Sequence, residues 1–152
     1  MTLGDTNFWL ALSLSKHLFH PAARRWFDGQ SAPASVQFCR ATQQSVLRLL
    51  TTESVLRPYG IGPMTNAAAW ELYEDLLADR RIAWAAEPEA AAVGARWKLL
   101  GAAGAASPKL WMDAYLAAFA IESGQQLVTT DKGFRQFKGL DAIVLEPTAV
   151  KS

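Results

Sequence analysis

Residues 110–134 read LWMDAYLAAFAIESGQQLVTTDKGF, and this stretch decides the fold class of the chain. A nearly all-apolar helix is predicted from Lys109 to Glu122, and Gly124 supplies a typical helix end. The segment from Gln126 to Thr129 is then predicted to be a short strand. A buried helix that leads directly into a strand is typical of proteins in which helices pack on a parallel sheet.

The same alternation of strands and helices continues on both sides of this stretch. We expect the other strands at 1–4, 35–40, 82–85 and 142–146, and helices at 7–18, 21–29, from 42 through 50, from 65 through 77, and at 89–100. The connections are too long for hairpins, which favours parallel pairing. The prediction is a three-layer α/β sandwich with a mostly parallel five-stranded sheet between helices.

Composition narrows the possible classes of protein. A chain of 152 residues with 51% apolar and 19% charged residues is expected to fold as one domain over residues 1–152. Its single cysteine, Cys39, excludes a disulfide framework and a cysteine-based zinc cluster. The net charge of +1 neither requires nor excludes nucleic acid. Without a signal peptide pattern or a membrane-length apolar run, we expect a cytoplasmic protein with no membrane association.

Three aspartates stand where the predicted fold would place a ligand site. Asp5 follows the first strand, Asp131 follows the fourth, and Asp113 lies among apolar residues in the first turn of the helix before the fourth strand. Each has an ordinary explanation, as a helix cap, a turn residue or a helix-dipole charge. Ligands of parallel sheets bind beyond the carboxyl ends of the strands. Three carboxylates converging there would repel one another without a cation, and Mg²⁺ prefers such oxygen ligands. This pattern suits metal-assisted hydrolysis of a phosphodiester.

These motifs resemble those of a known family. The strand followed by Asp5-Thr6-Asn7, the segment 111–120 (WMDAYLAAFA) and the segment 127–134 (LVTTDKGF) resemble the acidic motifs of PIN-domain ribonucleases, in particular VapC-type toxins. Length and strand order match over essentially the whole chain. The resemblance implies a strand order of 3-2-1-4-5, which would place Asp5 beside Asp131.

The resemblance also implies a function. It assigns metal-ligand and catalytic roles to Asp5, Asp113 and Asp131 with Mg²⁺ or Mn²⁺ as the cofactor, and Asn7 would support the first ligand. The implied activity is that of a metal-dependent endoribonuclease, the toxin of a type II toxin–antitoxin system. The implied partners are RNA, a cognate antitoxin and a second copy of the chain in a homodimer.

One family feature is missing. The family usually has a further acid on the helix after the second strand, where this chain has Ser45, and Glu53 lies eight residues further along, about 12 Å in a helix. The departure leaves open the number of metal ions and the strength of the activity. An alternative is therefore a PIN-like RNA-binding module with weakened or no nuclease activity. A receiver-like phosphotransfer domain would need a second acid beside Asp5, and Thr6-Asn7 supplies none.

Other notable residues have ordinary interpretations. His17 and His20 are expected at the end of the first helix, and Cys39 is expected to be an inert thiol in a buried strand. The tryptophans are expected to pack in the core or in a dimer interface: Trp9, Trp26, Trp70, Trp84, Trp97 and Trp111. Four arginines are expected to be solvated, with an RNA path beside the cleft as the alternative: Arg24, Arg25, Arg40 and Arg48.

Overall fold

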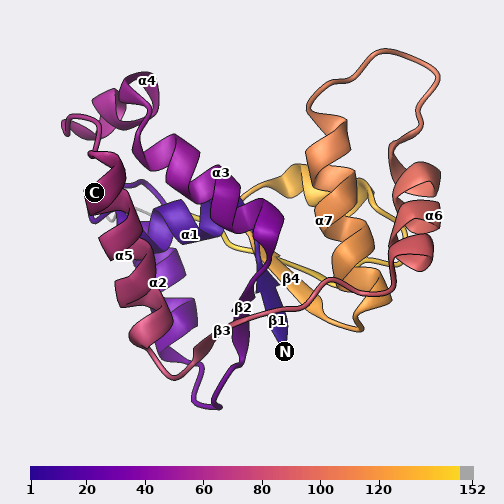
Figure 1. Cartoon of the computed structure of the whole chain (residues 1–152), viewed down its shortest axis with the longest axis horizontal. Helices are drawn as coiled ribbons and strands as arrows, with labels where there is room; N and C mark the ends of the chain where they lie inside the picture. The colour runs from indigo at the N-terminus through magenta and orange to yellow at the C-terminus, as the bar shows by residue number, and fades with distance from the viewer. Residues whose placement is uncertain (148–152) are drawn as a thin grey trace.

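A computed structural model describes residues 1–147 (Figure 1). The strands are β1 (Thr2–Gly4), β2 (Val36–Phe38), β3 (Ile82–Trp84), β4 (Gln126–Thr129) and β5 (Ala142–Val144). The helices are α1 (Thr6–Ser13), α2 (His20–Asp28), α3 (Arg40–Leu50), α4 (Glu53–Leu56), α5 (Asn66–Ala78), α6 (Ala90–Gly101) and α7 (Leu110–Glu122), with 3-10 turns η1 (Arg57–Tyr59) and η2 (Lys132–Gln136).

The five strands form one parallel sheet in the order β3-β2-β1-β4-β5. Strand β1 lies at the centre, where Leu3 is in register with Gln37 of β2 on one side and with Leu127 of β4 on the other. The expected strand order and the parallel pairing are therefore confirmed. From β1 the strand order runs to β2 and β3 on one side and to β4 and β5 on the other. The carboxyl ends of β1 and β4 therefore meet at the topological switch point.

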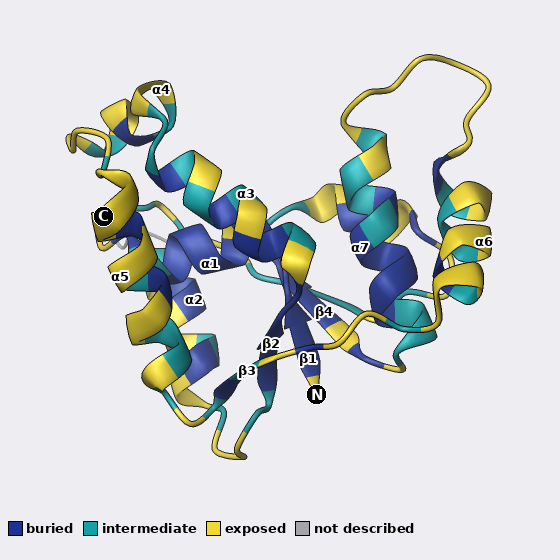
Figure 2. Cartoon of the chain, in the orientation of Figure 1, coloured by how far each residue is buried: buried dark blue, intermediate teal, exposed yellow. Residues whose placement is uncertain are grey.

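Each face of the sheet has its own core. Side chains alternate along a strand, so Leu127 and Val128 of β4 belong to different apolar clusters. One cluster joins the sheet to α1, α2, α3 and α5, and the other joins it mainly to α7. Figure 1 shows the corresponding helices on the two sides of the strands, and Figure 2 shows that much of α7 is buried. This is the three-layer sandwich expected from the sequence.

The first helix is shorter than expected. It ends at Ser13, not at Leu18, because Leu14 adopts an extended backbone conformation while its N–H still bonds back into the helix. The chain then turns before α2. His17 lies in this turn and His20 begins α2, so the prediction that both end the first helix was wrong. Burial lowers the pKa of His17, which favours its neutral form.

The start of α3 also differs from the prediction. Cys39, not Thr42, is the residue that precedes the helix, and β2 is shorter than the predicted strand. The Thr42 hydroxyl, one turn into the helix, accepts the Cys39 N–H at 3.0 Å. Cys39 is buried between sheet and helix, and this burial raises the pKa of its thiol. It behaves as an apolar core residue, as expected.

The tryptophans do not all pack in the core. Trp9 is completely buried, whereas Trp70, Trp84 and Trp111 are 47%, 39% and 50% exposed. These three side chains therefore do not pack in the core of the chain, and a dimer interface remains the prediction for them. Over residues 1–147, the helices lack the combined length and hydropathy that a bilayer-spanning segment needs.

Candidate active site

Asp5 lies where β1 passes into α1, at the centre of the carboxyl edge of the sheet. It is only 4% exposed. One carboxylate oxygen accepts the N–H of Thr6 at 2.7 Å, so Asp5 caps the helix. The other oxygen accepts the hydroxyl hydrogen of Thr129 at 2.7 Å. Two hydrogen bonds therefore fix the orientation of a buried acid.

The residue before Asp5 must be glycine because an aromatic ring lies directly against it. A Cβ atom on Gly4 would come within 2.6 Å of the Trp9 indole. The indole stacks on Phe38 with ring centroids 3.8 Å apart, and its N–H donates to the Gly4 carbonyl at 3.1 Å. This packing leaves the ring no room to move and sets the position of the backbone that carries Asp5.

Thr129 joins two of the predicted site residues. Its hydroxyl donates to Asp5 and accepts the backbone N–H of Asp131 at 3.0 Å. Asp131 in turn caps η2 by accepting the N–H of Gly133 at 2.8 Å. Sequence reasoning missed Thr129 and assigned the supporting role to Asn7, which is exposed. The sequence signal for Thr129 is that it is a polar residue at the end of a largely apolar strand.

Asp113 lies half-buried in the first turn of α7 and completes the group. Burial is the main cause that raises its pKa to about 6, and repulsion from Asp131 adds to it. Burial likewise raises the pKa of Asp5 to about 7 against the lowering effect of its hydrogen bonds, with repulsion from both other aspartates contributing. The three acids are therefore close enough to oppose one another's ionisation.

The carboxylates do not form a closed metal cage. Within the described part of the chain, no three His, Cys, Asp or Glu side chains are grouped tightly enough to hold an ion by themselves. Mg²⁺, however, keeps several water molecules and usually takes only one or two carboxylates directly. A buried, mutually repelling set of oxygen donors suits such a cation, because positive charge would remove the cost of ionising Asp5.

Glu53 does not take the place of the acid missing from α3. Ser45 lies on α3, the helix after the second strand, as expected, and its side chain is half-buried. Glu53 belongs to a separate short helix, α4, where it pairs with Arg57 at 3.1 Å on the surface. This position confirms that Glu53 is a poor substitute.

The candidate RNA-binding arginines differ in their surroundings. Arg24 forms a surface ion pair with Asp28 at 3.2 Å, one turn away on α2. Arg40 lies at the start of α3, beside the carboxyl edge of the sheet, with its guanidinium 4.4 Å from the centre of the Trp84 ring. Only Arg40 of these two therefore lies beside the candidate site.

The sequence is similar to known nucleases. Residues 3–140 match the model of the PIN domain family. The chain is 51% identical over 146 residues to Ribonuclease VapC41 of Mycobacterium tuberculosis, in both the CDC 1551 and the H37Rv strains, covering 95% of this chain and 99% of the relative.

Solved structures agree on the fold. Mycobacterium tuberculosis VapC20, a sarcin-ricin loop cleaving toxin, matches with a TM-score of 0.60 at 20% identity, over 93% of this chain and 98% of its own. VapBC2 of Rickettsia felis, bound to a DNA fragment from its promoter, matches with a TM-score of 0.59 at 13% identity, over 95% and 98%. FitAcB of Neisseria gonorrhoeae gives 0.57 at 19% identity, over 99% and 100%.

Proposed function

The chain belongs to the PIN-domain family and, within it, to the VapC ribonuclease toxins of toxin–antitoxin systems, and from this premise we propose that Asp5, Asp113 and Asp131 form its active site. The observation that carries the proposal is the mutual repulsion of three acids at the switch point of the sheet, two of them largely or partly removed from water. Such an arrangement is costly for a fold and is typical of a catalytic site.

The cofactor in this proposal is Mg²⁺ or Mn²⁺. When bound, such an ion polarises the scissile phosphate, increases the acidity of water and offsets the repulsion between the acidic edge and RNA. Asp5, Asp113 and Asp131 would hold it. Thr129 would keep one oxygen of Asp5 in a fixed orientation, since its hydroxyl donates to that oxygen at 2.7 Å.

The chain's own carboxylates also supply the base for the reaction. Water attacks the scissile phosphorus in line and one of the three aspartates accepts its proton, while the bond from phosphorus to the leaving ribose oxygen breaks and that oxygen takes up a proton from solvent. Arg40, a basic side chain beside this edge, would contact the RNA.

The proposal includes two protein partners and a cytoplasmic location, where RNA is available. We infer a cognate antitoxin that covers the acidic edge and offers an arginine or lysine to its carboxylates. We also infer a homodimer, because helices α6 and α7 expose Leu99 and Trp111 by 73% and 50%. Sedimentation of a monomer at high protein concentration would remove the dimer from the proposal.

The alternative is a PIN-like RNA-binding module with a weakened site, and the absence of an acid on α3 favours it. Ser45→Glu restores a carboxylate at that position. If cleavage increases in this variant, the natural site is weakened by the missing acid. If cleavage is unchanged or lower, the chain forms its metal site without that ligand.

The direct test is cleavage of structured RNA with Mg²⁺ or Mn²⁺, compared with the Asp5→Asn variant and with chelated metal. Asn keeps the shape of Asp and can still cap α1, so the fold should persist. We expect cleavage by the natural chain alone, and only with metal. Equal cleavage by the natural chain and Asp5→Asn would refute the assignment.

A further inference from the structure

A recess opens at the same edge of the sheet as the acidic group. It has a volume of about 260 Å³ and is lined by Arg40, Trp84, Ala85, Glu87, Tyr115 and Phe119. These residues come from the start of α3, the end of β3, the connection to α6, and α7. Because β3 lies two strands from β1, the recess lies about 10 Å from Asp5 along the same edge of the sheet.

One wall of the recess is a flat, cationic surface. Trp84 is 39% exposed although it ends a strand, and the Arg40 guanidinium lies 4.4 Å from its ring centre. Arg40 is held there by a hydrogen bond to the Gln43 side chain at 2.6 Å. Tryptophan rings and arginine planes are the surfaces on which proteins stack unpaired bases of RNA.

Another part of the recess offers an oriented acceptor. The Tyr115 hydroxyl donates to one carboxylate oxygen of Glu87 at 3.0 Å. Arg40 bonds to Gln43 and lies on Trp84, and no ion pair joins it to Glu87 within residues 1–147. Glu87 therefore keeps acceptor capacity that a ligand with N–H groups can use.

We propose that this recess binds an unpaired guanine of the RNA, stacked on Trp84 and Arg40 and hydrogen-bonded to Glu87, next to the phosphate that is cut. The inference rests on the proposed function and names the base that the site selects. Guanine carries two adjacent N–H donors on its Watson–Crick edge, which a carboxylate accepts together. Adenine and cytosine each offer one amino group there, and uracil offers a single N–H.

The test measures binding of labelled pentanucleotides UUGUU, UUIUU, UUAUU and UUUUU by fluorescence anisotropy in Mg²⁺, with their integrity checked by electrophoresis. We expect UUGUU to bind about tenfold more tightly than UUAUU or UUUUU, as a bidentate contact provides. Inosine retains one of guanine's two donors, so UUIUU should be intermediate. In Glu87→Gln, the preference for guanine should fall below about threefold.

Two tryptophan variants separate stacking from general effects. Trp84→Ala should weaken binding of every pentanucleotide by about tenfold, the usual contribution of a stacked base. Trp70→Ala is the matched control, since Trp70 is 47% exposed and its indole donates to Glu74 on α5, on another face. It should leave all affinities unchanged.

The outcomes distinguish this inference from the proposed function. Equal affinity for all four pentanucleotides, in a protein that cleaves RNA and loses cleavage in Asp5→Asn, would overturn the guanine pocket and leave the nuclease standing. A guanine preference that depends on Glu87, in a protein that does not cleave, would support the pocket and contradict the nuclease. If Trp84→Ala alters sedimentation but no RNA affinity, the recess is a protein contact and the inference is wrong.

Discussion

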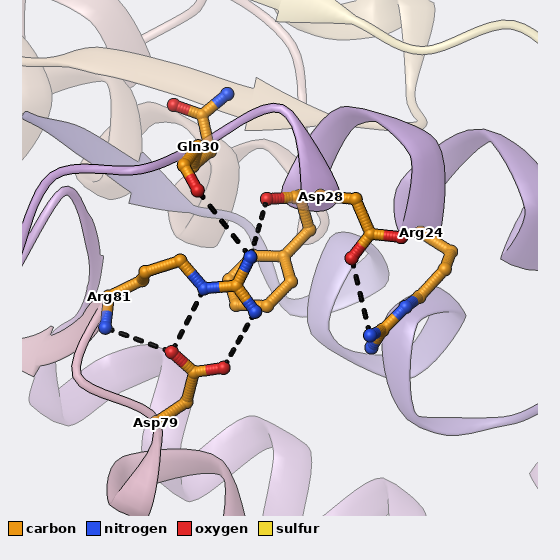
Figure 3. A network of polar contacts seen from close by, with 6 residues as sticks. Arg24, Asp28, Gln30, Asp79 and Arg81 are labelled. Carbon is orange, nitrogen blue, oxygen red and sulfur yellow. Dashed lines mark hydrogen bonds and ion pairs between the residues drawn. The ribbon is translucent and has the colours of Figure 1, made fainter.

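The aspartates at the two ends of the sheet have pKa values shifted in opposite directions. At the amino end, Asp79 lies beside Arg81, with a nitrogen–oxygen distance of 2.7 Å and a second hydrogen bond at 3.0 Å. The same guanidinium donates to the Phe27 carbonyl and lies 3.9 Å from the centre of the Phe27 ring. Figure 3 shows the guanidinium of Arg81 with its bonds to Asp79. These bonds hold the pKa of Asp79 down, at about 2.

At the carboxyl end, burial without a cationic partner raises the pKa of Asp5 to about 7. The difference separates structural charge from functional charge. A paired aspartate stabilises the fold by linking α2 to the start of β3, whereas the buried aspartates destabilise it until a ligand neutralises them. The role of an aspartate is therefore indicated by the groups around its carboxylate and not by its position at the end of a strand.

The largest difference should appear when an aspartate is replaced by asparagine at each end of the sheet and RNA cleavage is compared. Asp113→Asn removes one charge from the acidic group and should lower RNA cleavage by about a hundredfold or more while the fold survives. Asp79→Asn, the matched control, should retain cleavage at a temperature where it is folded. Rates are measured on one RNA in Mg²⁺. Equal losses in the two variants would remove the distinction between the two ends.

Overpacking at the carboxyl end should reduce stability. Gly4→Ala places a Cβ atom 2.6 Å from the buried Trp9 indole and should cost about 1–3 kcal/mol, since the ring is fixed by its neighbours. This corresponds to roughly 2–4 °C of melting temperature for each kcal/mol. Gly94→Ala is the control, because a Cβ atom there meets nothing within 4 Å. A Gly4→Ala melting temperature equal to that of the natural chain would contradict the packing argument.

The pH dependence of stability should differ for the two ends. Without metal, the raised pKa values of Asp5 and Asp113 contribute to the free energy of unfolding. This contribution is fully present below pH about 4 and is lost as the pH rises through about 6–7. The lowered pKa of Asp79 gives a stabilising contribution that is present above pH about 4 and is lost as the pH falls toward 2. Thermal melts in chelator should therefore show a decrease from pH 5 to 8 that Asp5→Asn reduces. An identical decrease in that variant would argue against a buried, ionising Asp5.

The smallest effect should be the stability lost at the amino end. Asp79→Asn weakens an ion pair whose side chains are 32% and 19% exposed, so solvent screening limits the loss to about 1 kcal/mol at pH 7. Denaturant unfolding at pH 7 and at pH 2 measures it. The loss should nearly vanish at pH 2, where the natural aspartate is itself partly protonated.

The sequence was sufficient for the architecture and for where the three aspartates lie in it, for identifiable reasons. Apolar segments separated by Gly124 and by polar turns determine the order of strands and helices, and parallel pairing then brings Asp5 near Asp131. Helix ends were less predictable, because local hydrogen bonds decide them. Leu14 ends α1 through an extended backbone, and Cys39 takes the place expected of Thr42.

The contacts between distant segments could not be predicted. The bond from Thr129 to Asp5 joins residues 124 positions apart, and neither side chain alone indicates it. The pairing of Trp84 with Arg40 likewise depends on how β3 lies beside β2. Apolar character predicted packing in the core or in a dimer interface for Trp70, Trp84 and Trp111, and strand-end and helix-surface positions leave all three exposed in the single chain.

The most direct test of the central claim, that the acids at the carboxyl edge hold a divalent cation, is calorimetric titration of Mn²⁺ into the natural chain, Asp5→Asn and Asp79→Asn at pH 7. We expect binding to the natural chain with release of protons, because the pKa of Asp5 is raised to about 7. Asp5→Asn should bind at least about tenfold more weakly, and Asp79→Asn should match the natural chain. Equal Mn²⁺ affinity in the natural chain and Asp5→Asn would contradict the account.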